Sequence, residues 1–342
     1  MILPKKRKIP AIIVVILVIA IIVSSFVYFN SQKPYKGNIE HITIGVFPSE
    51  YNSLIYIAND QQYFSNNGLK ITLKNYPSGA AAVGGMLNGK VDIATASEFV
   101  VANNALQSAN LNAFGSLSKY NNLYLVARPD KGINSISDLV GKRIGLTIGT
   151  GNQFYLGRFL ELHGINQNQV TLVNVNFAQI PNALSNGTID AAIIFQPYLN
   201  QIQSLLGNAT LVWPAQADQF GYFEAISTKT WANTHPELIE RFLKAIIQAQ
   251  NLNINNQNKA ISIVSRDLNY NTSYTSSVWS DYRYTVELDQ SFILLMQDEA
   301  RWLINNNLTT ATSVPNFLDY VYVDGLKSVS PESVNIIGMG TQ

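Results

Sequence analysis

The 342-residue sequence contains no cysteine. Without cysteine the chain can form no disulfide, carry no thiolate nucleophile, bind no zinc through sulfur and hold no bacterial lipoprotein anchor. Histidine is almost as scarce, because only His41, His163 and His235 are present. None of the three has metal-ligand spacing or stands beside a candidate nucleophile, and the Gly-x-Ser-x-Gly motif is missing. The sequence therefore predicts no catalytic residue, no metal site and no cofactor.

Charged residues are also few, at 13%, against 47% hydrophobic residues, which excludes a disordered chain. The formal net charge is +1, but residues 5–8 supply four of the 23 basic residues and no acidic residue precedes Glu40. The other 19 basic and 22 acidic residues give a balance of −3. No basic surface is left for nucleic acid, so we exclude that partner. A chain this poor in charge would suit an acidic exterior, which we state as a hypothesis.

One long apolar run follows the basic cluster. Residues 11–29 are interrupted only by Ser24, Ser25 and Tyr28. This length suits a helix that crosses a bilayer and exceeds the usual apolar core of a cleaved signal. The basic cluster stays cytoplasmic by the positive-inside rule, so we expect a single N-terminal span at the cell membrane with the bulk of the chain extracellular. A signal cleaved after the small residue Ser25 is the alternative.

The chain carries a long internal repeat. Residues 68–94 and residues 164–192 each open on Gly plus an apolar residue and run through a strand with Thr-Leu-x-Asn. Each then crosses a short helix and closes on Asn-Gly-x-x-Asp, ending at Asp92 and Asp190. Copies about a hundred residues apart are too distant for a stacked solenoid and indicate two α/β lobes built on one plan. Both aspartates fall at strand starts, away from the edge where a ligand is expected, so we interpret them as structural.

Strands and helices alternate through both copies, which predicts mainly parallel sheets with ligand sites at the carboxyl ends of the strands. Two strands crossing between the lobes would act as a hinge for closure. The apolar patterns predict strands at residues 41–47, 122–128, 143–148, 191–195 and 222–227. They predict helices at residues 53–64, 99–108, 152–162, 237–251, 288–305 and 317–327.

The chain is therefore expected to visit the first lobe, the second lobe and the first lobe again. The expected divisions are a cytoplasmic tail and membrane anchor at 1–30, a spacer at 31–39, lobe 1 at 40–127, lobe 2 at 128–222, the return to lobe 1 with C-terminal helices at 223–330, and a tail at 331–342.

The strongest local signal for a ligand site is the turn from Gly149 to Asn152, between a strand and a helix. Glycines let backbone amides approach a ligand, and a helix N-terminus offers N–H groups and a positive dipole end. The turn is not a dinucleotide fingerprint, because Phe154 stands where the third glycine belongs. A tight turn with a helix cap is the alternative interpretation.

Three segments together resemble the solute-binding proteins of ABC importers. They are GVFPSEYNSLIYIANDQQYFSNNGLKITL at residues 45–73, GKRIGLTIGTGNQFYLGRFLELHGI at 141–165 and ALSNGTIDAAIIFQPYL at 183–199. The resemblance is to the nitrate, sulfonate and taurine branch, which also includes binders of thiamine precursors, and it covers residues 40–330. It implies the α/β type II periplasmic-binding fold, with two lobes, two crossing strands, and closure on a ligand before docking on a permease.

The resemblance also implies ligand contacts in the loops at the strand ends, to which Tyr222 is added because it lies near the hinge. No arginine stands in these loops, so backbone amides and hydroxyls would have to hold an oxyanion. Many relatives carry an acid where this chain has Gln196, and its loss removes repulsion of an anion but also a partner for an amine such as taurine. The candidate ligand-binding residues are Ser49, Tyr51, Asn52, Ser78, Gly79, Ser97, Glu98, Thr147, Gly149, Thr150, Gly151, Asn152, Gln196 and Tyr222.

These observations predict a monomeric, membrane-tethered solute-binding protein of an ABC importer that is not an enzyme. It would bind a small polar or anionic metabolite, similar to a sulfonate, taurine or nitrate, and deliver it to the permease and its ATPase. A binder of thiamine-precursor pyrimidines, or an enzyme on the same fold, is one alternative, although such enzymes use histidine and cysteine motifs. A membrane-tethered ligand sensor is another, although only about ten residues precede the expected span.

Overall fold

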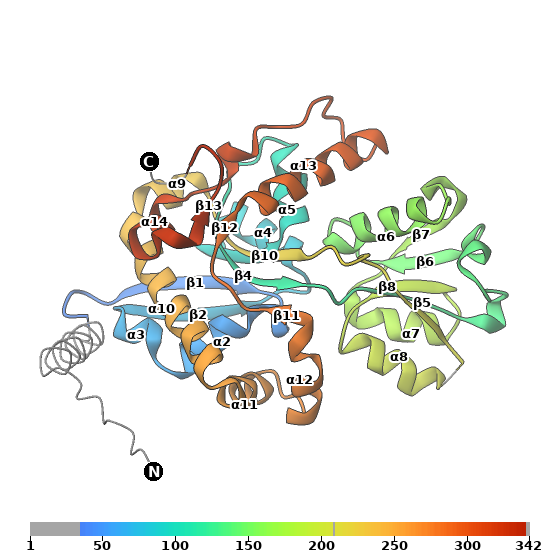
Figure 1. The fold of residues 1–342 in the computed structure, drawn as a ribbon, viewed down its shortest axis with the longest axis horizontal. Coiled ribbons are helices and arrows are strands. Elements are labelled where there is room, and N and C mark those ends of the chain that lie inside the picture. Colours follow the sequence, from blue (N-terminus) through green and yellow to red (C-terminus); the bar gives the residue numbers. More distant parts are fainter. Residues whose placement is uncertain (1–34, 208, 340–342) are drawn as a thin grey trace, which may run out of the picture.

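The computed structural model describes residues 35–207 and 209–339, which form two α/β lobes lying side by side (Figure 1). The apolar run at residues 11–29, expected to span the membrane, lies outside the described residues. Among the helices that are described, none combines the length and the apolar character needed to cross a bilayer.

Lobe 1 is built on a six-stranded sheet with the strand order β11-β4-β10-β3-β1-β2. The central strand β3 is buried at every position, as expected for a strand covered by helices on both faces. The repeat strands β1, β2 and β3 run parallel, whereas β10 is antiparallel to β3 and β4. The strands are β1 (Glu40–Val46), β2 (Leu69–Asn75), β3 (Ile93–Ser97), β4 (Asn112–Tyr120), β10 (Gly221–Ser227) and β11 (Tyr282–Arg283).

Lobe 2, drawn in green in Figure 1, has a five-stranded sheet with the order β7-β6-β8-β5-β9. Its repeat strands β6, β7 and β8 are again parallel, and β5 is antiparallel to β8 and β9. All five strands are only four residues long. They are β5 (Tyr124–Ala127), β6 (Arg143–Leu146), β7 (Thr171–Asn174), β8 (Ala191–Ile194) and β9 (Leu211–Pro214).

The chain crosses between the lobes twice, as expected. It leaves lobe 1 from β4 into β5 and returns from β9 into β10. These crossing strands run antiparallel to their neighbours in both sheets, because a strand that enters a lobe from its partner cannot share the direction of the repeat strands. The sheets are therefore mixed, where the sequence predicted mainly parallel ones.

Helices cover both sheets. Lobe 2 carries α6 (Gly151–Leu162), α7 (Ile180–Ser185) and α8 (Tyr198–Leu206). Lobe 1 carries α2 (Ser53–Asp60), α3 (Tyr63–Asn66), α4 (Gly79–Leu87), α5 (Glu98–Ala105), α9 (Lys229–Thr234), α10 (Pro236–Asn255), α11 (Gln257–Asp267), α12 (Thr272–Val278), α13 (Gln290–Asn305) and α14 (Asp324–Val329).

Short elements fill several connections. They are the 3-10 helices η1 (Glu50–Asn52), η2 (Pro129–Lys131), η3 (Ile136–Leu139), η4 (Gln167–Gln169), η5 (Phe177–Gln179), η6 (Trp279–Asp281), η7 (Phe317–Tyr320) and η8 (Pro331–Ser333), and the paired strands β12 (Leu288–Asp289) and β13 (Val334–Asn335).

Three details differ from the predicted elements. The helix expected at 53–64 is broken between α2 and α3, where Gln62 has a left-handed backbone. The helix expected at 317–327 is instead η7, a bridge at Val321, and α14. Strand β4 was not predicted, because Gly115, Ser116 and Ser118 interrupt its apolar pattern.

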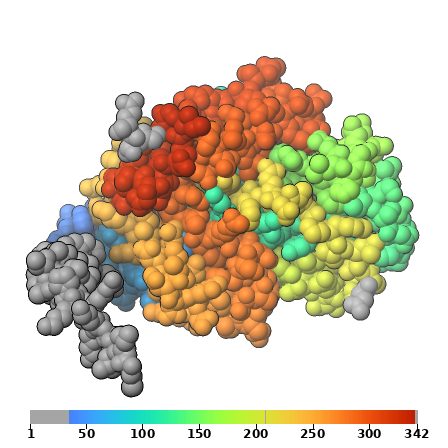
Figure 2. Space-filling view, in the orientation of Figure 1, coloured from blue at the N-terminus to red at the C-terminus, as the bar shows by residue number. Residues whose placement is uncertain are grey.

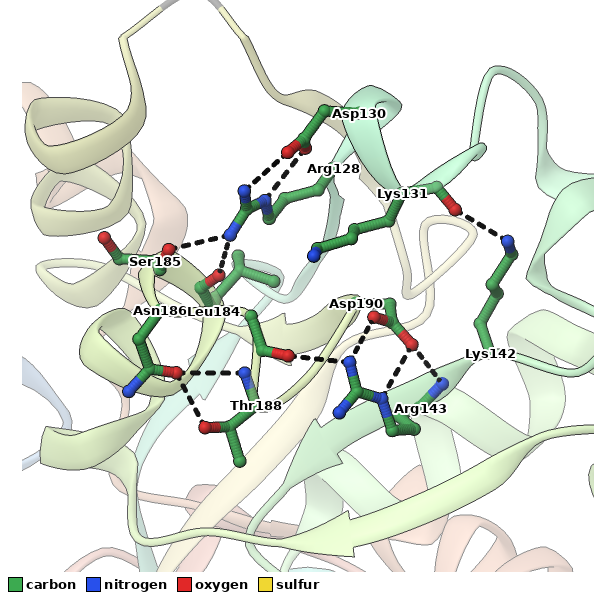
Figure 3. Close-up of polar contacts among 11 residues, drawn as sticks. Arg128, Asp130, Lys131, Lys142, Arg143, Leu184, Ser185, Asn186, Thr188 and Asp190 are labelled. Carbon is green, nitrogen blue, oxygen red and sulfur yellow. Dashed lines mark hydrogen bonds and ion pairs between the residues drawn. The ribbon is translucent and has the colours of Figure 1, made fainter.

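The repeat is reproduced at the level of single hydrogen bonds. In lobe 1, Asp92 Oδ2 accepts the Thr43 N–H at 2.8 Å, and the Asp92 N–H donates to the Thr43 carbonyl at 2.9 Å. In lobe 2, Asp190 Oδ2 accepts the Arg143 N–H at 2.9 Å, and the Asp190 N–H donates to the Arg143 carbonyl at 2.8 Å (Figure 3). Each aspartate thus ties the start of one parallel strand to its neighbour, which confirms their structural interpretation.

Candidate ligand-binding site

A pocket lies at the seam between the lobes, next to the two crossing connections. Its cavity volume is about 40 Å³, well below the range usual for small-molecule sites, so the lining side chains fill most of the seam in this conformation. Residues from both lobes line it. They are Phe47, Tyr51, Gly79, Ala80, Ser97, Val100, Tyr120 and Phe223 from lobe 1, and Thr150, Gly151, Asn152, Phe177 and Phe195 from lobe 2.

The loop after β1 places Phe47 and Tyr51 against the pocket. Two polar side chains hold this loop, because Ser49 Oγ and Asn52 Nδ2 both donate to the Phe47 carbonyl, at 3.1 Å and 2.8 Å. Tyr51 is fixed from the other side, where its hydroxyl donates to Asn122 Oδ1 at 2.9 Å. The polar residues of the loop therefore serve the backbone, and the aromatic ones face the pocket.

The first turn of α4 reaches the pocket from lobe 1. Ser78 caps this helix, because its Oγ accepts the Ala81 N–H at 3.2 Å. A Cβ on Gly79 would lie 2.8 Å from the Cα of Ala96, so only glycine lets the helix start so close to β3. The amides of a first helical turn do not enter the helix's own hydrogen bonds, and those of Gly79 and Ala80 belong to residues that line the pocket.

The first turn of α6 occupies the matching place in lobe 2. Thr150 Oγ1 donates to the Thr147 carbonyl at 2.7 Å, and the Gly149 N–H donates to Gln153 Oε1 at 2.9 Å, so the turn is held by its own polar groups. Gly149 has a φ of 78°, a conformation that glycine tolerates best. Asn152 Nδ2 donates to the Ile193 carbonyl at 3.2 Å and ties the helix start to the end of β8.

The lobes touch across the pocket. A Cβ on Gly151 of lobe 2 would lie 3.0 Å from the Tyr120 hydroxyl and 3.5 Å from Ser97 Oγ, both in lobe 1. A second contact between the lobes is made by Trp302 of α13, which packs over Gly157 of lobe 2 and donates from Nε1 to Glu161 Oε1 at 3.0 Å. The space-filling view shows the orange C-terminal part of lobe 1 directly against the green lobe 2 (Figure 2).

One amide side chain joins the two crossing connections. Gln216, between β9 and β10, accepts the N–H groups of Asn122 and Leu123 on Oε1, at 2.7 Å and 3.0 Å. Its Nε2 donates to the carbonyls of Tyr120 and Gln219, at 3.1 Å and 2.9 Å. Gln216 is 3% exposed, so these four bonds are shielded from water.

Six of the fourteen predicted ligand-binding residues line the pocket. They are Tyr51, Gly79, Ser97, Thr150, Gly151 and Asn152. Eight others lie outside the lining, and most of them hold the loops that carry it. They are Ser49, Asn52, Ser78, Glu98, Thr147, Gly149, Gln196 and Tyr222. Thr147, for example, donates from Oγ1 to the Val175 carbonyl at 2.8 Å.

Two of these eight were placed one residue away from a residue that does line the pocket. Successive side chains of a strand point to opposite faces, so Phe223 faces the pocket while Tyr222 turns to the far side and donates to Asp289 Oδ1 at 3.0 Å. Gln196 follows the pocket residue Phe195, and its amide bonds Asn200 in the first turn of α8, with Nε2 to Oδ1 at 2.9 Å.

A group of buried carboxyls stands behind the pocket in lobe 1. Glu98 follows Ser97 and accepts the Tyr222 N–H at 2.9 Å and the Tyr155 hydroxyl at 3.4 Å. Burial raises the pKa of Glu98 to about 8. Burial, followed by the neighbouring Glu98 charge, also raises the pKa of Glu299 and of Glu224 well above the ordinary range. Burial therefore favours the neutral, protonated form of all three acids.

Five aromatic residues of the lining were missed by the sequence reasoning. The sequence predicts polar groups at the strand ends, whereas the pocket is also lined by Phe47, Tyr120, Phe177, Phe195 and Phe223. A signal was present in part, because Phe47 and Phe195 directly follow the parallel strands β1 and β8, one in each lobe.

Within the part of the chain that the structure describes, no group of three histidine or acidic side chains is placed to hold a metal ion. His163 and His235 lie at helix ends, where their Nδ1 atoms contact the carbonyls of Phe159 and Trp231 at 2.7 Å and 3.1 Å. None of the three histidines lines the pocket.

Comparisons with known proteins extend this picture. The family profile described as NMT1/THI5 like matches residues 50–260. The taurine-binding periplasmic protein of Escherichia coli K12 is 29% identical over 195 residues, which cover 56% of this chain and 60% of that protein. The match thus spans less than two thirds of that relative. The putative aliphatic sulfonates-binding protein of Bacillus subtilis 168 is 24% identical over 226 residues, or 64% of this chain and 67% of that protein.

Among solved structures, the alkanesulfonate-binding protein SsuA from Xanthomonas axonopodis pv. citri, bound to MOPS, aligns with a TM-score of 0.73. The alignment covers 84% of this chain and 99% of SsuA at 17% identity. This likeness shows that the two lobes and their crossing strands form the periplasmic-binding-protein fold.

Proposed function

The chain belongs to the NMT1/THI5-like family, and from that membership we propose that it is the solute-binding component of an ABC importer. In this proposal a small polar or anionic metabolite enters the pocket between the lobes, and the lobes close over it before the protein docks on a permease driven by its ATPase. The observation that carries the proposal is the convergence of three helix starts from both lobes, at Gly79, Ser97 and Gly151, on a single pocket.

Helix starts suit such a ligand for two reasons. Their free N–H groups can donate to oxygen atoms, and the positive end of each helix dipole favours an anion. Glu98, which follows the lining residue Ser97, adds little negative charge below neutral pH, because burial raises its pKa to about 8. The relatives that are named for taurine and aliphatic sulfonates support a ligand of this class.

The proposed location, oligomeric state and lack of enzyme activity rest on the sequence and the family. We place the protein outside the cytoplasmic membrane, held by the apolar run at residues 11–29, and expect it to act as a monomer. We also propose that it is not an enzyme. Among the described residues that line the pocket, none is a histidine, an acid or a lysine, so Ser97 and Thr150 have no base in the lining to activate them as nucleophiles.

Ligand binding by the purified full chain tests the proposal. Thermal unfolding with ethanesulfonate, taurine, nitrate or thiamine-precursor pyrimidine should show a rise in Tm that grows with the concentration of at least one polar or anionic solute. Small-angle scattering should then show a more compact particle. Asn152→Ala should weaken binding about tenfold, while Gln196→Ala, which alters an amide outside the pocket, serves as the matched control. No stabilisation by any of these solutes would contradict the proposal.

A further inference from the structure

The pocket wall is rich in aromatic rings. Six of its thirteen lining residues are aromatic, and among these described residues none carries a charge. A short alkyl chain with a polar head needs only a modest apolar wall. Six rings offer flat surfaces and ring edges, which bind other flat rings better than they bind alkyl groups of similar area.

The rings come from both lobes and meet across the seam. Phe47 of lobe 1 has its centroid 5.5 Å from that of Phe177 and 6.0 Å from that of Phe195, both in lobe 2. Tyr51 of lobe 1 lies 5.6 Å from Phe195. These pairs are tilted or edge-to-face, with interplanar angles of 51°, 87° and 75°. These distances leave no room for a further ring while the lobes are together. When the lobes move apart, a flat ring can enter and exchange each contact across the seam for two contacts with itself.

Part of the wall is already ordered for stacking. Tyr51 stacks on Phe223 at 4.9 Å with an interplanar angle of 22°, and Tyr120 meets Tyr51 edge-on at 4.9 Å and 83°. The Tyr51 hydroxyl is held by Asn122, whose Nδ2 in turn donates to the Tyr282 hydroxyl at 2.8 Å. Because Tyr51 is fixed by hydrogen bonds and by its neighbours, it would lose little rotational freedom when a ligand binds.

The polar part of the wall is built for a single small acceptor group. Ser97 Oγ and the start of α6 at Gly151 face each other across the seam, and the start of α4 lies beside the end of β3 that Ser97 terminates. These groups donate hydrogen bonds through amides and a hydroxyl. No carboxylate is available among the lining residues to pair with an ammonium group, so an amino sulfonate would bury an unpaired charge.

We propose that the solute is a single flat aromatic ring bearing one small anionic group, such as an aryl sulfonate or aryl carboxylate, and not an amino-alkyl sulfonate. This inference rests on the proposed function, because it specifies the ligand of the same pocket. The ring lies between Phe47, Tyr51 and Phe195, and the anionic group meets the helix starts at Gly79, Ser97 and Gly151.

The test is a matched series of ligands measured by calorimetry on the full chain at pH 6. Benzenesulfonate should bind at least about tenfold more tightly than cyclohexanesulfonate, which has a ring of similar size that is not flat, and than ethanesulfonate and taurine. It should also bind about tenfold more tightly than methyl phenyl sulfone, which keeps the ring and loses the charge.

Two variants locate the effect. Phe195→Leu keeps an apolar side chain but removes a ring, and it should reduce the preference for benzenesulfonate over cyclohexanesulfonate to about threefold or less. Phe159→Leu, which alters a buried ring of α6 that lies outside the pocket, should leave the preference unchanged. If Phe195→Leu unfolds, Phe47→Leu removes the facing ring from the other lobe.

Each other result has a separate meaning. If ethanesulfonate or taurine binds as tightly as benzenesulfonate, the inference is wrong and the proposed function stands. If methyl phenyl sulfone binds as tightly as benzenesulfonate, the anionic group is wrongly assigned and the inference fails in that form. If no sulfonate of either kind binds to the folded chain, the inference fails. The proposed function fails with it only if nitrate and thiamine-precursor pyrimidine also leave the Tm unchanged.

Discussion

The two lobes share one strand-pairing device but differ in what surrounds it. Asp92 and Asp190 stand at equivalent places and accept the N–H of the neighbouring strand at nearly the same distance, 2.8 Å and 2.9 Å. In lobe 2, Asp190 also accepts from Arg143 Nε at 3.0 Å and Arg143 Nη2 at 2.7 Å (Figure 3). The backbone bond is thus the part common to the two copies, and the ion pair is an addition confined to the lobe with four-residue strands.

The lobes also differ in how they hold acids. Among the described carboxyls, those with a raised pKa all lie in lobe 1, with Glu50, Glu98 and Glu299 buried completely. Asp130, Asp138 and Asp190 of lobe 2 have a lowered pKa, because arginine side chains or hydrogen-bond donors stabilise their charge. The larger lobe therefore holds buried acids that favour the neutral form besides ionised ones such as Glu332, whereas every described acid of the smaller lobe with a shifted pKa is stabilised as an anion.

The largest expected effect follows from this difference. A carboxyl with a raised folded pKa contributes stability in full below its unfolded value, 4.5 for Glu, and loses it as the pH rises through the folded value. Glu50, with a pKa of about 7, should account for about 3 kcal/mol, and Glu98, with a pKa of about 8, extends the loss above neutrality. We expect the Tm of the full chain to fall steadily between pH 5 and pH 8.5.

The control for this prediction is Glu50→Gln, which should flatten the curve between pH 5 and pH 7 because the amide cannot ionise. Hydrogen exchange at pH 8.5 should show lobe 1 losing protection before lobe 2. The lowered pKa of Asp190 acts in the opposite direction, and its contribution is lost only as the pH falls below about 4. A Tm that stays level or rises from pH 5 to pH 8 would refute the assignment of neutral buried acids.

The next effect concerns the start of α4 in lobe 1. Gly79→Ala places a Cβ 2.8 Å from backbone atoms of β3 inside lobe 1, so the helix has to move. We expect it to lower the free energy of unfolding by about 2 kcal/mol, as overpacking does elsewhere. Denaturant unfolding measures this directly. Gly84→Ala, at a position on the same helix where a Cβ meets nothing, should be neutral or slightly stabilising and serves as the matched control.

A smaller effect distinguishes the aspartate–backbone hydrogen bond, which both lobes have, from the Arg143–Asp190 ion pair, which was described only for lobe 2. Asp190→Ala should cost about 2 kcal/mol and Asp92→Ala about 1 kcal/mol, because only Asp190 also binds a guanidinium. In an Arg143→Ala background the two substitutions should cost the same, which a double-mutant cycle of unfolding free energies tests. An undiminished difference in that background would mean that the strands, and not the ion pair, distinguish the lobes.

The smallest effect on stability should accompany a clear effect on binding. Gly151→Ala adds a Cβ 3.0 Å from the Tyr120 hydroxyl across the seam, so it obstructs closure rather than folding. We expect less than about 1 kcal/mol lost in unfolding and about a tenfold loss of affinity for the best solute found in the thermal screen. If stability falls as much as in Gly79→Ala and affinity does not change, Gly151 supports the lobe and not the contact between lobes.

Most of the fold could be predicted from the sequence, because the internal repeat specifies strands and turns in both lobes. Thr-Leu-x-Asn and Asn-Gly-x-x-Asp mark the strands and turns of both lobes, and the crossing strand at 222–227 was recognised from its apolar pattern. Strands β4 and β9 were missed because their sequences lack alternation, and pairing with distant strands stabilises them instead. Long-range pairing of this kind leaves no local signal.

For the site, the sequence predicted the loops that form it but not all of the individual lining residues. Every loop expected at the seam contributes a lining residue, yet at Gln196 and Tyr222 the lining residue is the neighbouring one, Phe195 or Phe223. Phe223 in place of Tyr222 shows why, because the face of a strand depends on pairing across the sheet, including register shifts in β10, that sequence alone does not specify. The aromatic wall was overlooked because Phe at a strand end is also what a hydrophobic core predicts.

Gln216 has a consequence for the way the halves of the molecule can move. Its side chain links the returning connection to the outgoing one through three hydrogen bonds, to Tyr120, Asn122 and Leu123, so we expect neither connection to twist without moving the other. We therefore expect the two lobes to rotate relative to each other about one hinge near Gln216. The lining residues of the two lobes would then close on a solute in nearly the same relative orientation each time.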